Sequence, residues 1–259
     1  MDICKDISVV IQGPLDNRTY EAIDQYQYFN EVIVSTWNTD DISLLNQAVG
    51  KYKLVTSNYP QNIASYYNGG SRYFMAQTTF AGASIASGKY VMKTRSDELY
   101  PDLSAMLSNL EKYPDRVHTT DNGFWTNIKG AFSNHLFIDK TNHIVDAMSK
   151  HIAYSSKQDP QKSSYLNSIF MCAEQSFGYF LMLARGYDLL ETNVNTVYKN
   201  NMFITPCYML NGHLHSGQTS KDKARGFKRS SDPYPNGRKD VHNGRHDVRH
   251  LCQNIEDLQ

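Results

Sequence analysis

The stretch DISVVIQGPL, residues 6–15, indicates the fold class of the chain. Residues 7–11 form a short run rich in β-branched side chains, which predicts a buried strand. Gly13 and Pro14 end this strand, because proline has no N–H for a β-ladder and glycine lets the backbone turn. A loop or helix is expected to follow, so the stretch predicts a strand and the start of the segment that connects it to the next strand.

Three further runs repeat this pattern. EVIVSTWN (31–38) and KLVTSNYP (53–60) are rich in β-formers and end in polar residues, and KYVMKT (89–94) is a fourth such run. The segments between them are long enough for crossover helices. Short apolar strands that alternate with such segments predict an α/β fold with a parallel sheet covered by helices.

Helical periodicity appears between and after these strands. Residues 70–87 carry small and apolar side chains at helical intervals, and residues 101–114 place Leu103, Met106, Leu107 and Leu110 on one stripe behind the cap Asp102. A further helix is expected within residues 172–186, with Gly186 as its stop. Short strands are expected within residues 116–125 and 135–140, and a short helix near residues 143–150.

Composition excludes several functional classes. The chain has 259 residues, of which 26 are Lys or Arg and 26 are Asp or Glu, so no global charge indicates nucleic acid or an anionic membrane. Its four cysteines are scattered without a CxxC spacing, which predicts free thiols. The first 20 residues lack a signal-peptide core, so we expect a cytoplasmic protein. Nine Lys or Arg against four Asp within residues 221–249 predict a basic loop or arm, through which at most peripheral membrane contact is expected.

The polar ends of the predicted strands should share one rim of the sheet, where ligands of open α/β folds bind. The stretch GKYVMKTRSDELYP (88–101) sets two cations, Lys93 and Arg95, before an acidic pair at such an end. The cations suit a phosphate group, and the oxygens of Asp97 and Glu98 suit Mg²⁺ or Mn²⁺. The alternative is a set of ordinary solvated loops with local ion pairs.

The segments VVIQGPL, VIVSTWN, QTTFAG and GKYVMKTRSDE, in this order, resemble the WavE-like lipopolysaccharide-synthesis family and, more broadly, glycosyltransferases of the GT-A fold. The resemblance covers roughly the first half of the chain, and AEQSFGYF in the second half is also similar. It implies a GT-A-like, Rossmann-like, mostly parallel central sheet flanked by helices. Residues 1–220 would form this domain, with a nucleotide-sugar-binding half (1–100) and an acceptor-binding half (101–220), followed by the extension 221–259.

The resemblance also implies binding residues for a nucleotide-sugar donor. Gln12 and Gly13 would lie near the base or ribose, with Trp37 and Asn38 nearby. Two residues of the next helix, Arg72 and Gln77, would contact the nucleotide or the donor sugar. The acceptor would be a glycan or glycolipid in surface polysaccharide synthesis, and no nucleic acid is expected.

The metal site implied by the resemblance departs from its usual pattern. Asp97 matches the last acid of the DxD motif, but Arg95 stands in place of the first. A divalent cation, Mn²⁺ or Mg²⁺, is one expectation, with His215 as a C-terminal ligand from the HxH pair formed with His213. The alternatives are that Arg95 supplies the positive charge and that the histidines are structural or face solvent.

An inverting transfer needs a general base at the acceptor hydroxyl. The resemblance implies Glu174 for this role, with Asp121 in reserve, while the alternative for Glu174 is an acid favoured by its helix dipole.

Two rival functions remain open. A sugar-phosphate nucleotidyltransferase would need a glycine-rich basic loop after the first strand, of which QGPLDNR is a poor version, and the other rival is a non-catalytic sugar- or nucleotide-binding protein of the same fold.

Overall fold

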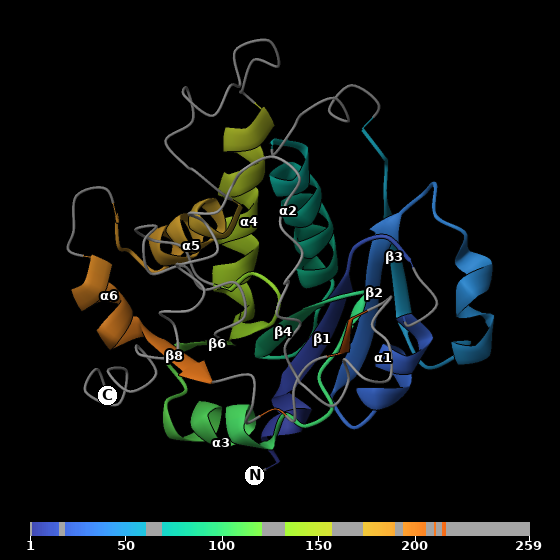
Figure 1. Cartoon of the computed structure of the whole chain (residues 1–259), viewed down its shortest axis with the longest axis horizontal. Coiled ribbons are helices and arrows are strands. Elements are labelled where there is room, and N and C mark those ends of the chain that lie inside the picture. The colour runs from blue at the N-terminus through green and yellow to red at the C-terminus, as the bar shows by residue number, and fades with distance from the viewer. Residues whose placement is uncertain are drawn as a thin grey trace, which may run out of the picture.

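A seven-stranded sheet forms the centre of the protein in the computed structural model, which describes residues 2–15, 19–60, 69–120, 133–156, 173–189, 194–205, 210 and 214–215 (Figure 1). The strand order is β3-β2-β1-β4-β7-β6-β8. The strands are β1 (Ile7–Gln12), β2 (Glu31–Trp37), β3 (Lys53–Ser57), β4 (Tyr90–Arg95), β6 (Val117–Thr120), β7 (Phe137–Lys140) and β8 (Met202–Thr205).

Only β7 runs against the other strands of this sheet. The pairs β1–β2, β1–β4, β2–β3 and β6–β8 are parallel, whereas β7 is antiparallel to both β4 and β6. The expected mostly parallel α/β architecture is therefore confirmed. Reversal of β7 places the residues that precede it at the same rim as the carboxyl ends of β1, β2 and β4.

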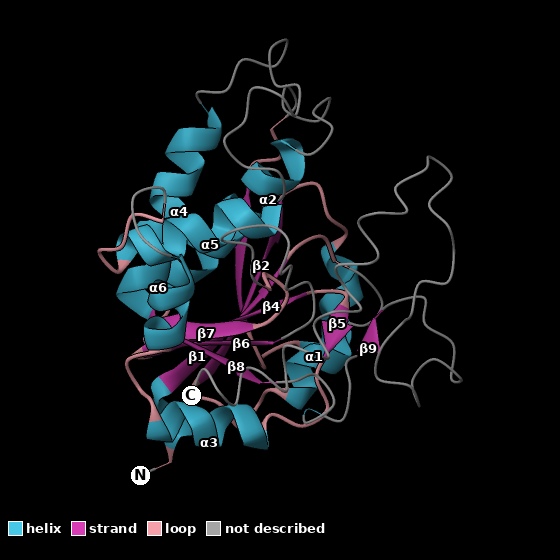
Figure 2. Cartoon of the chain, turned by 60° about the vertical axis from the view of Figure 1, so that its left-hand side comes forward, coloured by secondary structure: helices cyan, strands magenta, loops and turns pink. Residues whose placement is uncertain are grey.

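Helices cover both faces of the sheet (Figure 2). The helices α2 (Gly69–Ser84), α4 (Thr141–Ser156), α5 (Ala173–Ala184) and α6 (Val194–Asn201) contribute to the core on one face, whereas α1 (Thr19–Gln25), α3 (Ser104–Lys112) and the 3₁₀ segment η2 (Ile42–Ala48) contribute to the other. Successive residues of β1 face opposite cores: Val9 and Ile11 pack with α1, and Val10 packs with α2. This explains why the strand is apolar without alternation.

A second sheet of two strands lies beside this body. It pairs β5 (Glu98–Leu99) with β9 (Leu214–His215) in antiparallel register, and the 3₁₀ segment η1 (Ile3–Asp6) precedes β1. No helix among the described residues is long and apolar enough to cross a membrane.

The observed elements follow the sequence expectations closely. The first three strands and the stripe of α3 lie where the sequence predicts them, and Asp102 accepts a hydrogen bond from the Ser104 N–H at 2.9 Å at the start of α3. The helix α4 is longer than the eight residues expected, because its buried stripe continues from Ile144 and Met148 to His151. The end of the strand predicted within 116–125 falls outside the described residues, which stop at residue 120 before the next described segment begins at 133.

Helix α2 approaches the sheet closely at Gly82. A Cβ on this residue would lie 2.5 Å from Cγ1 of Val10 and 3.1 Å from Cβ of Ser35. Real Cβ atoms do not approach other atoms at 2.5 Å, so glycine is required for this packing. Among the described cysteines, Cys4 is a free thiol, as expected.

Candidate active site

A pocket of about 590 Å³ opens at the carboxyl ends of β1, β2 and β4. The structure brings seven of the predicted site residues to its wall: Gln12, Gly13, Trp37, Lys93, Arg95, Asp97 and Glu174. They come from segments up to 162 positions apart in the chain (174 minus 12), so the fold, and not local sequence, assembles the site.

Backbone contacts fix the floor of the pocket where β1 and β4 end. The N–H of Gly13 donates to the carbonyl of Ser35 at 3.1 Å, and the N–H of Ser96 donates to the carbonyl of Gln12 at 2.9 Å. Gly13 has a φ of +124°, and a Cβ there would meet Oγ of Ser96 at 2.9 Å. Ser96 also donates through Oγ to the carbonyl of Pro14. Glycine therefore lets the chain turn tightly against the loop that follows β4.

Three aromatic rings form one wall of the pocket. Trp37 meets Tyr59 edge to face with centroids 5.4 Å apart and meets Phe74 at 5.3 Å, while Tyr59 and Phe74 stack at 5.2 Å. Trp37 is buried, but Tyr59 is 37% exposed. The cluster offers flat apolar surface of the kind on which a planar ring stacks.

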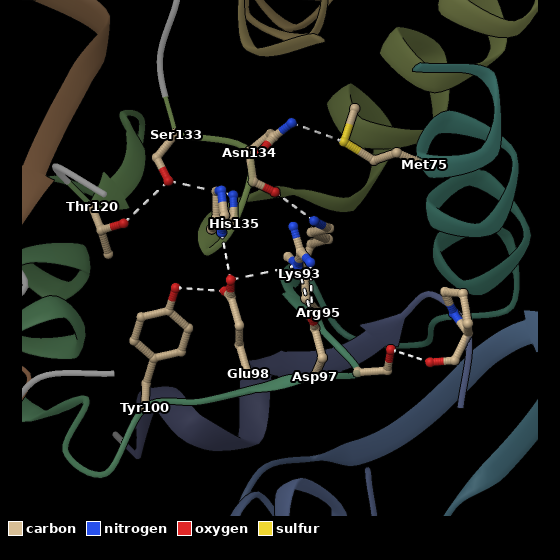
Figure 3. Close-up of polar contacts among 12 residues, drawn as sticks. Met75, Lys93, Arg95, Asp97, Glu98, Tyr100, Thr120, Ser133, Asn134 and His135 are labelled. Carbon is tan, nitrogen blue, oxygen red and sulfur yellow. Dashed lines mark hydrogen bonds and ion pairs between the residues drawn. The ribbon is translucent and has the colours of Figure 1, made fainter. Parts of the chain in front are cut away.

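Lys93 is a buried cation at the base of the pocket. Its side chain is 1% exposed, and Nζ donates to the backbone carbonyl of Asn134 (Figure 3). Burial is the main reason that the pKa of Lys93 falls from 10.5 to about 7, and the positive charge of Arg95 lowers it further. A lysine held in this way gains charge readily when an anion arrives, because the anion favours its protonated form.

Arg95 and Asp97 form a two-point ion pair. Nε of Arg95 donates to Oδ1 of Asp97 at 2.8 Å, and an Nη donates to Oδ2 at 2.7 Å. Burial alone would lower the pKa of Arg95, but the bonds to Asp97 and the charge of Glu98 outweigh it and raise that pKa. The Arg95 side chain remains 38% exposed, so part of the guanidinium stays accessible to a ligand.

This pairing bears directly on the expected divalent ion. Both oxygens of Asp97 accept from Arg95, so a metal would have to displace the guanidinium before Asp97 could bind it. Within the described ranges, no group of three or more His, Cys, Asp or Glu side chains is arranged to hold a metal ion. The described residues around Asp97 therefore fit a guanidinium better than a divalent cation.

Glu98, whose side chain is fully buried, is the centre of a second network. Oε1 lies 2.5 Å from Nδ1 of His135 and 3.5 Å from Nε of Arg95, and Oε2 accepts from the Tyr100 hydroxyl at 3.0 Å. Figure 3 shows His135 and Arg95 approaching the same carboxylate. His135 lines the pocket, whereas the Glu98 side chain is not exposed.

Glu174 approaches from the other half of the chain. It lies in the first turn of α5, is half-buried, and lines the pocket that Lys93 also lines. Its negative charge acts on Lys93, where it partly offsets the fall in pKa caused by burial. The pocket thus has a carboxylate in a helical first turn and two cations at the end of β4.

The remaining predicted residues have other positions. Asn38 is exposed, does not line the pocket, and instead holds the chain near Tyr59 by accepting from the Tyr59 N–H at 3.0 Å. Gln77 is half-buried on α2 and also lies outside the pocket lining.

Three candidates are described only in part or not at all. Arg72 belongs to α2 and His215 to β9, but their side chains lie outside what the structure describes, and Asp121 falls in the undescribed segment 121–132. The backbone of His215 pairs with Glu98, which brings the C-terminal segment to the acidic motif.

The lining residues that sequence reasoning missed include Tyr59, Phe74, Asn134 and His135. Tyr59 had a signal, because it follows the third strand at the polar rim that the sequence predicts. Asn134 and His135 precede β7, and they would have been found only if that strand had been recognised as antiparallel. The chain has 18 tyrosines, but this number alone does not indicate which of them would line a pocket.

No family model and no curated protein matches the chain. Solved structures share similarity with it at low identity. The chain aligns over 86% of its length with 97% of the 4-diphosphocytidyl-2C-methyl-D-erythritol synthase of Anaerococcus prevotii, at 11% identity and a TM-score of 0.43. It aligns over 78% of its length with the glycosyltransferase GlyE of Streptococcus pneumoniae, at 12% identity and a TM-score of 0.43, and with TarS of S. aureus, at 13% identity and a TM-score of 0.41.

The chain spans 45% of the GlyE chain and 35% of the TarS chain, less than half of either. At these scores the likeness assigns no activity to this chain, and a function has to be inferred from the pocket itself.

Proposed function

We propose that the protein is a glycosyltransferase that moves a sugar from a nucleotide-sugar donor to a hydroxyl group of a glycan or glycolipid. The observation that carries the proposal is the pocket at the carboxyl ends of β1, β2 and β4. It combines an aromatic wall, two cations and a carboxylate on a separate helix. A nucleotide sugar has a matching order of parts: a planar base, a diphosphate, and a sugar whose anomeric carbon is attacked.

The aromatic wall and the cations suit the two ends of a nucleoside diphosphate. A base would stack on the accessible face of Tyr59, supported by Trp37 and Phe74. Lys93 and Arg95 would hold the diphosphate, Lys93 as a point charge and Arg95 through the part of its guanidinium that Asp97 leaves accessible. Gln12, the last residue of β1, and Gly13, which follows it, lie between these two regions because β1 lies between β2 and β4, and they would contact the ribose or base.

The reaction proceeds by attack of an acceptor hydroxyl on the anomeric carbon. Glu174 accepts the hydroxyl proton, the new glycosidic bond forms, and the bond from the anomeric carbon to the diphosphate oxygen breaks with inversion. The electron pair of that bond leaves with the nucleoside diphosphate. Lys93 and Arg95 stabilise the negative charge that develops there, which lowers the barrier because both are fixed before the reaction begins.

Two finer features of the proposal come from the sequence resemblance alone: the WavE-like relationship and a role in surface polysaccharide or lipopolysaccharide-type synthesis. A cytoplasmic location is a separate expectation, and at most peripheral membrane contact is expected through the basic residues within 221–249. In the competing arrangement, a divalent ion bound by Asp97 and His215 would hold the diphosphate.

Thermal-shift binding tests the donor class. UDP, GDP, CDP, ADP and their common sugar conjugates are each added with Mn²⁺, with Mg²⁺ and with EDTA. We expect one nucleotide to raise the melting temperature, and its sugar conjugate to be converted to the free nucleoside diphosphate. Absence of any shift would contradict the transferase proposal. Release of pyrophosphate from a nucleoside triphosphate and a sugar phosphate would favour a nucleotidyltransferase instead.

A further inference from the structure

His135 occupies a position in the pocket that the proposed reaction has not yet used. Its side chain is 19% exposed and lines the pocket together with Lys93 and Arg95. Nδ1 lies 2.5 Å from Oε1 of Glu98, a buried carboxylate that also accepts from the Tyr100 hydroxyl. Because a carboxylate accepts hydrogen bonds, Nδ1 is the donor of this pair and Nε2 is the ring nitrogen left for a ligand.

Arg95 and His135 share one carboxylate oxygen. Nε of Arg95 is 3.5 Å from Oε1 of Glu98, the same atom that His135 approaches at 2.5 Å. Lys93 is tied to the residue before His135 through the Asn134 carbonyl. Three nitrogen-bearing side chains from β4 and from the segment before β7 therefore gather around one small region of the pocket.

We propose that His135, held by Glu98, is the third donor of a diphosphate subsite that works without a divalent ion. This inference rests on the proposed function and assigns the leaving-group side of its reaction. Nε2–H donates to a diphosphate oxygen while Arg95 and Lys93 contact the others. In this arrangement both ring nitrogens of His135 donate, Nδ1 to Glu98 and Nε2 to the diphosphate.

The charge arrangement explains why Asp97 is not needed as a metal ligand. Arg95 neutralises Asp97 through two hydrogen bonds, and Glu98 orients His135. The hydrogen-bond donors that would face the diphosphate in place of a metal are thus the side chains of Lys93, Arg95 and His135. The charged groups that face His135 or share its pocket wall are Glu98 from β5, Arg95 and Lys93 from β4, Asp97 from the turn between these strands, and Glu174 from α5. Tyr100 lies on the far side of Glu98.

The test uses pyrophosphate, which carries the diphosphate without a base, and the nucleoside diphosphate that gives the largest thermal shift. Affinities are measured by calorimetry in EDTA for the wild-type protein and for His135→Asn, whose amide can still donate to Glu98 but which lacks Nε2. We expect His135→Asn to weaken both ligands by about 10- to 100-fold, as for loss of a hydrogen bond to a charged group. Binding of the matching nucleoside, which has no phosphate, should not change.

The variant His143→Asn is the matched control. His143 also pairs with a carboxylate, Asp139, at 3.3 Å, but it does not line the pocket. Its substitution should leave pyrophosphate affinity unchanged. A second readout uses the wild-type protein alone: in imidazole ¹⁵N spectra, pyrophosphate should shift one of the nine histidine signals, and this readout remains informative if His135→Asn does not fold.

Three results would overturn the inference. They are equal pyrophosphate affinity in His135→Asn and wild type, loss of wild-type binding in EDTA, and a histidine spectrum that pyrophosphate does not change. If the wild-type protein bound no nucleotide with or without metal, the proposed function itself would fail, which is a different outcome from a loss confined to His135→Asn.

Discussion

Replacement of Lys93 by methionine should stabilise the protein while removing its ability to bind a diphosphate. Lys93 is 1% exposed, and its pKa falls from 10.5 to about 7, mainly because of burial. At about 1.4 kcal/mol per pKa unit, holding this group in the fold costs roughly 5 kcal/mol near neutral pH. Methionine has a similar shape without the charge, but it leaves the Asn134 carbonyl without its donor, a loss of about 1–3 kcal/mol.

The net expectation is a gain of roughly 2–4 kcal/mol in the free energy of unfolding at pH 7, or about 4–16 °C in melting temperature. The sign of the pH dependence follows from proton binding. Between pH 7 and 10.5 the unfolded wild-type chain binds more protons than the folded one, so wild-type stability rises with pH in this window. Lys93→Met lacks that rise, and its advantage should therefore shrink as the pH approaches 9.5.

Urea denaturation at pH 7 and at pH 9.5 measures both effects, and calorimetry with pyrophosphate measures binding. The control is Lys199→Met, which changes an exposed lysine on α6 and should alter neither stability nor affinity. The reasoning would be refuted if Lys93→Met were no more stable than wild type at pH 7, or if it bound pyrophosphate with unchanged affinity.

Three other substitutions test separate parts of the account. Glu174→Gln should lower the rate of sugar transfer by about 10²- to 10⁴-fold without weakening nucleotide binding. The control Glu111→Gln, on α3 and away from the pocket, should change neither the rate nor the binding. If Glu174→Gln kept full activity, Glu174 would not be the general base. Tyr59→Ala should weaken nucleoside diphosphate binding by roughly 10-fold or more and leave pyrophosphate binding unaltered, and an equal loss for both ligands would argue against base stacking. Gly82→Ala should destabilise the fold by about 1–3 kcal/mol in urea denaturation, because the new Cβ would lie 2.5 Å from Cγ1 of Val10. Unchanged stability would show that α2 can move away from the sheet.

The first strands and their polar ends could be predicted from sequence because each signal is local. The run that ends at Gly13 and Pro14 contains both the buried strand and the reason that it stops. Parallel strands must end at a common rim, so the order of the strands along the chain is enough to predict that Gln12, Trp37 and Arg95 lie near one another.

The direction of β7 could not be predicted in the same way. Its sequence, FIDK, fits a strand of either orientation, and only the register of Lys93 with Phe137 places His135 beside the end of β4. The sequence likewise left open whether Asp97 forms a local ion pair or binds a metal, because side chains at this spacing can pair with each other or with other partners. The structure decides between a metal ligand and an ion pair through side-chain geometry that no motif contains.

The aromatic wall shows a similar limit. Trp37 is predicted from its position at a strand end, but Phe74 lies on α2, where its spacing suits ordinary core packing. Its contact with Tyr59 depends on how the helix and the loop after β3 approach each other in space. Contacts between residues far apart in the chain produce no periodic pattern in the sequence, so they cannot be predicted from it.

The central claim is that the pocket releases a nucleoside diphosphate from a nucleotide sugar. The most direct measurement is ³¹P NMR of the wild-type protein with the nucleotide sugar whose nucleotide gives the largest thermal shift, together with a panel of oligosaccharide acceptors, in EDTA and with Mn²⁺. The account predicts that nucleoside diphosphate signals appear in both conditions, and that they are strongly reduced for Glu174→Gln. Unchanged nucleotide-sugar signals in both conditions, or release of nucleoside monophosphate in place of the diphosphate, would contradict it.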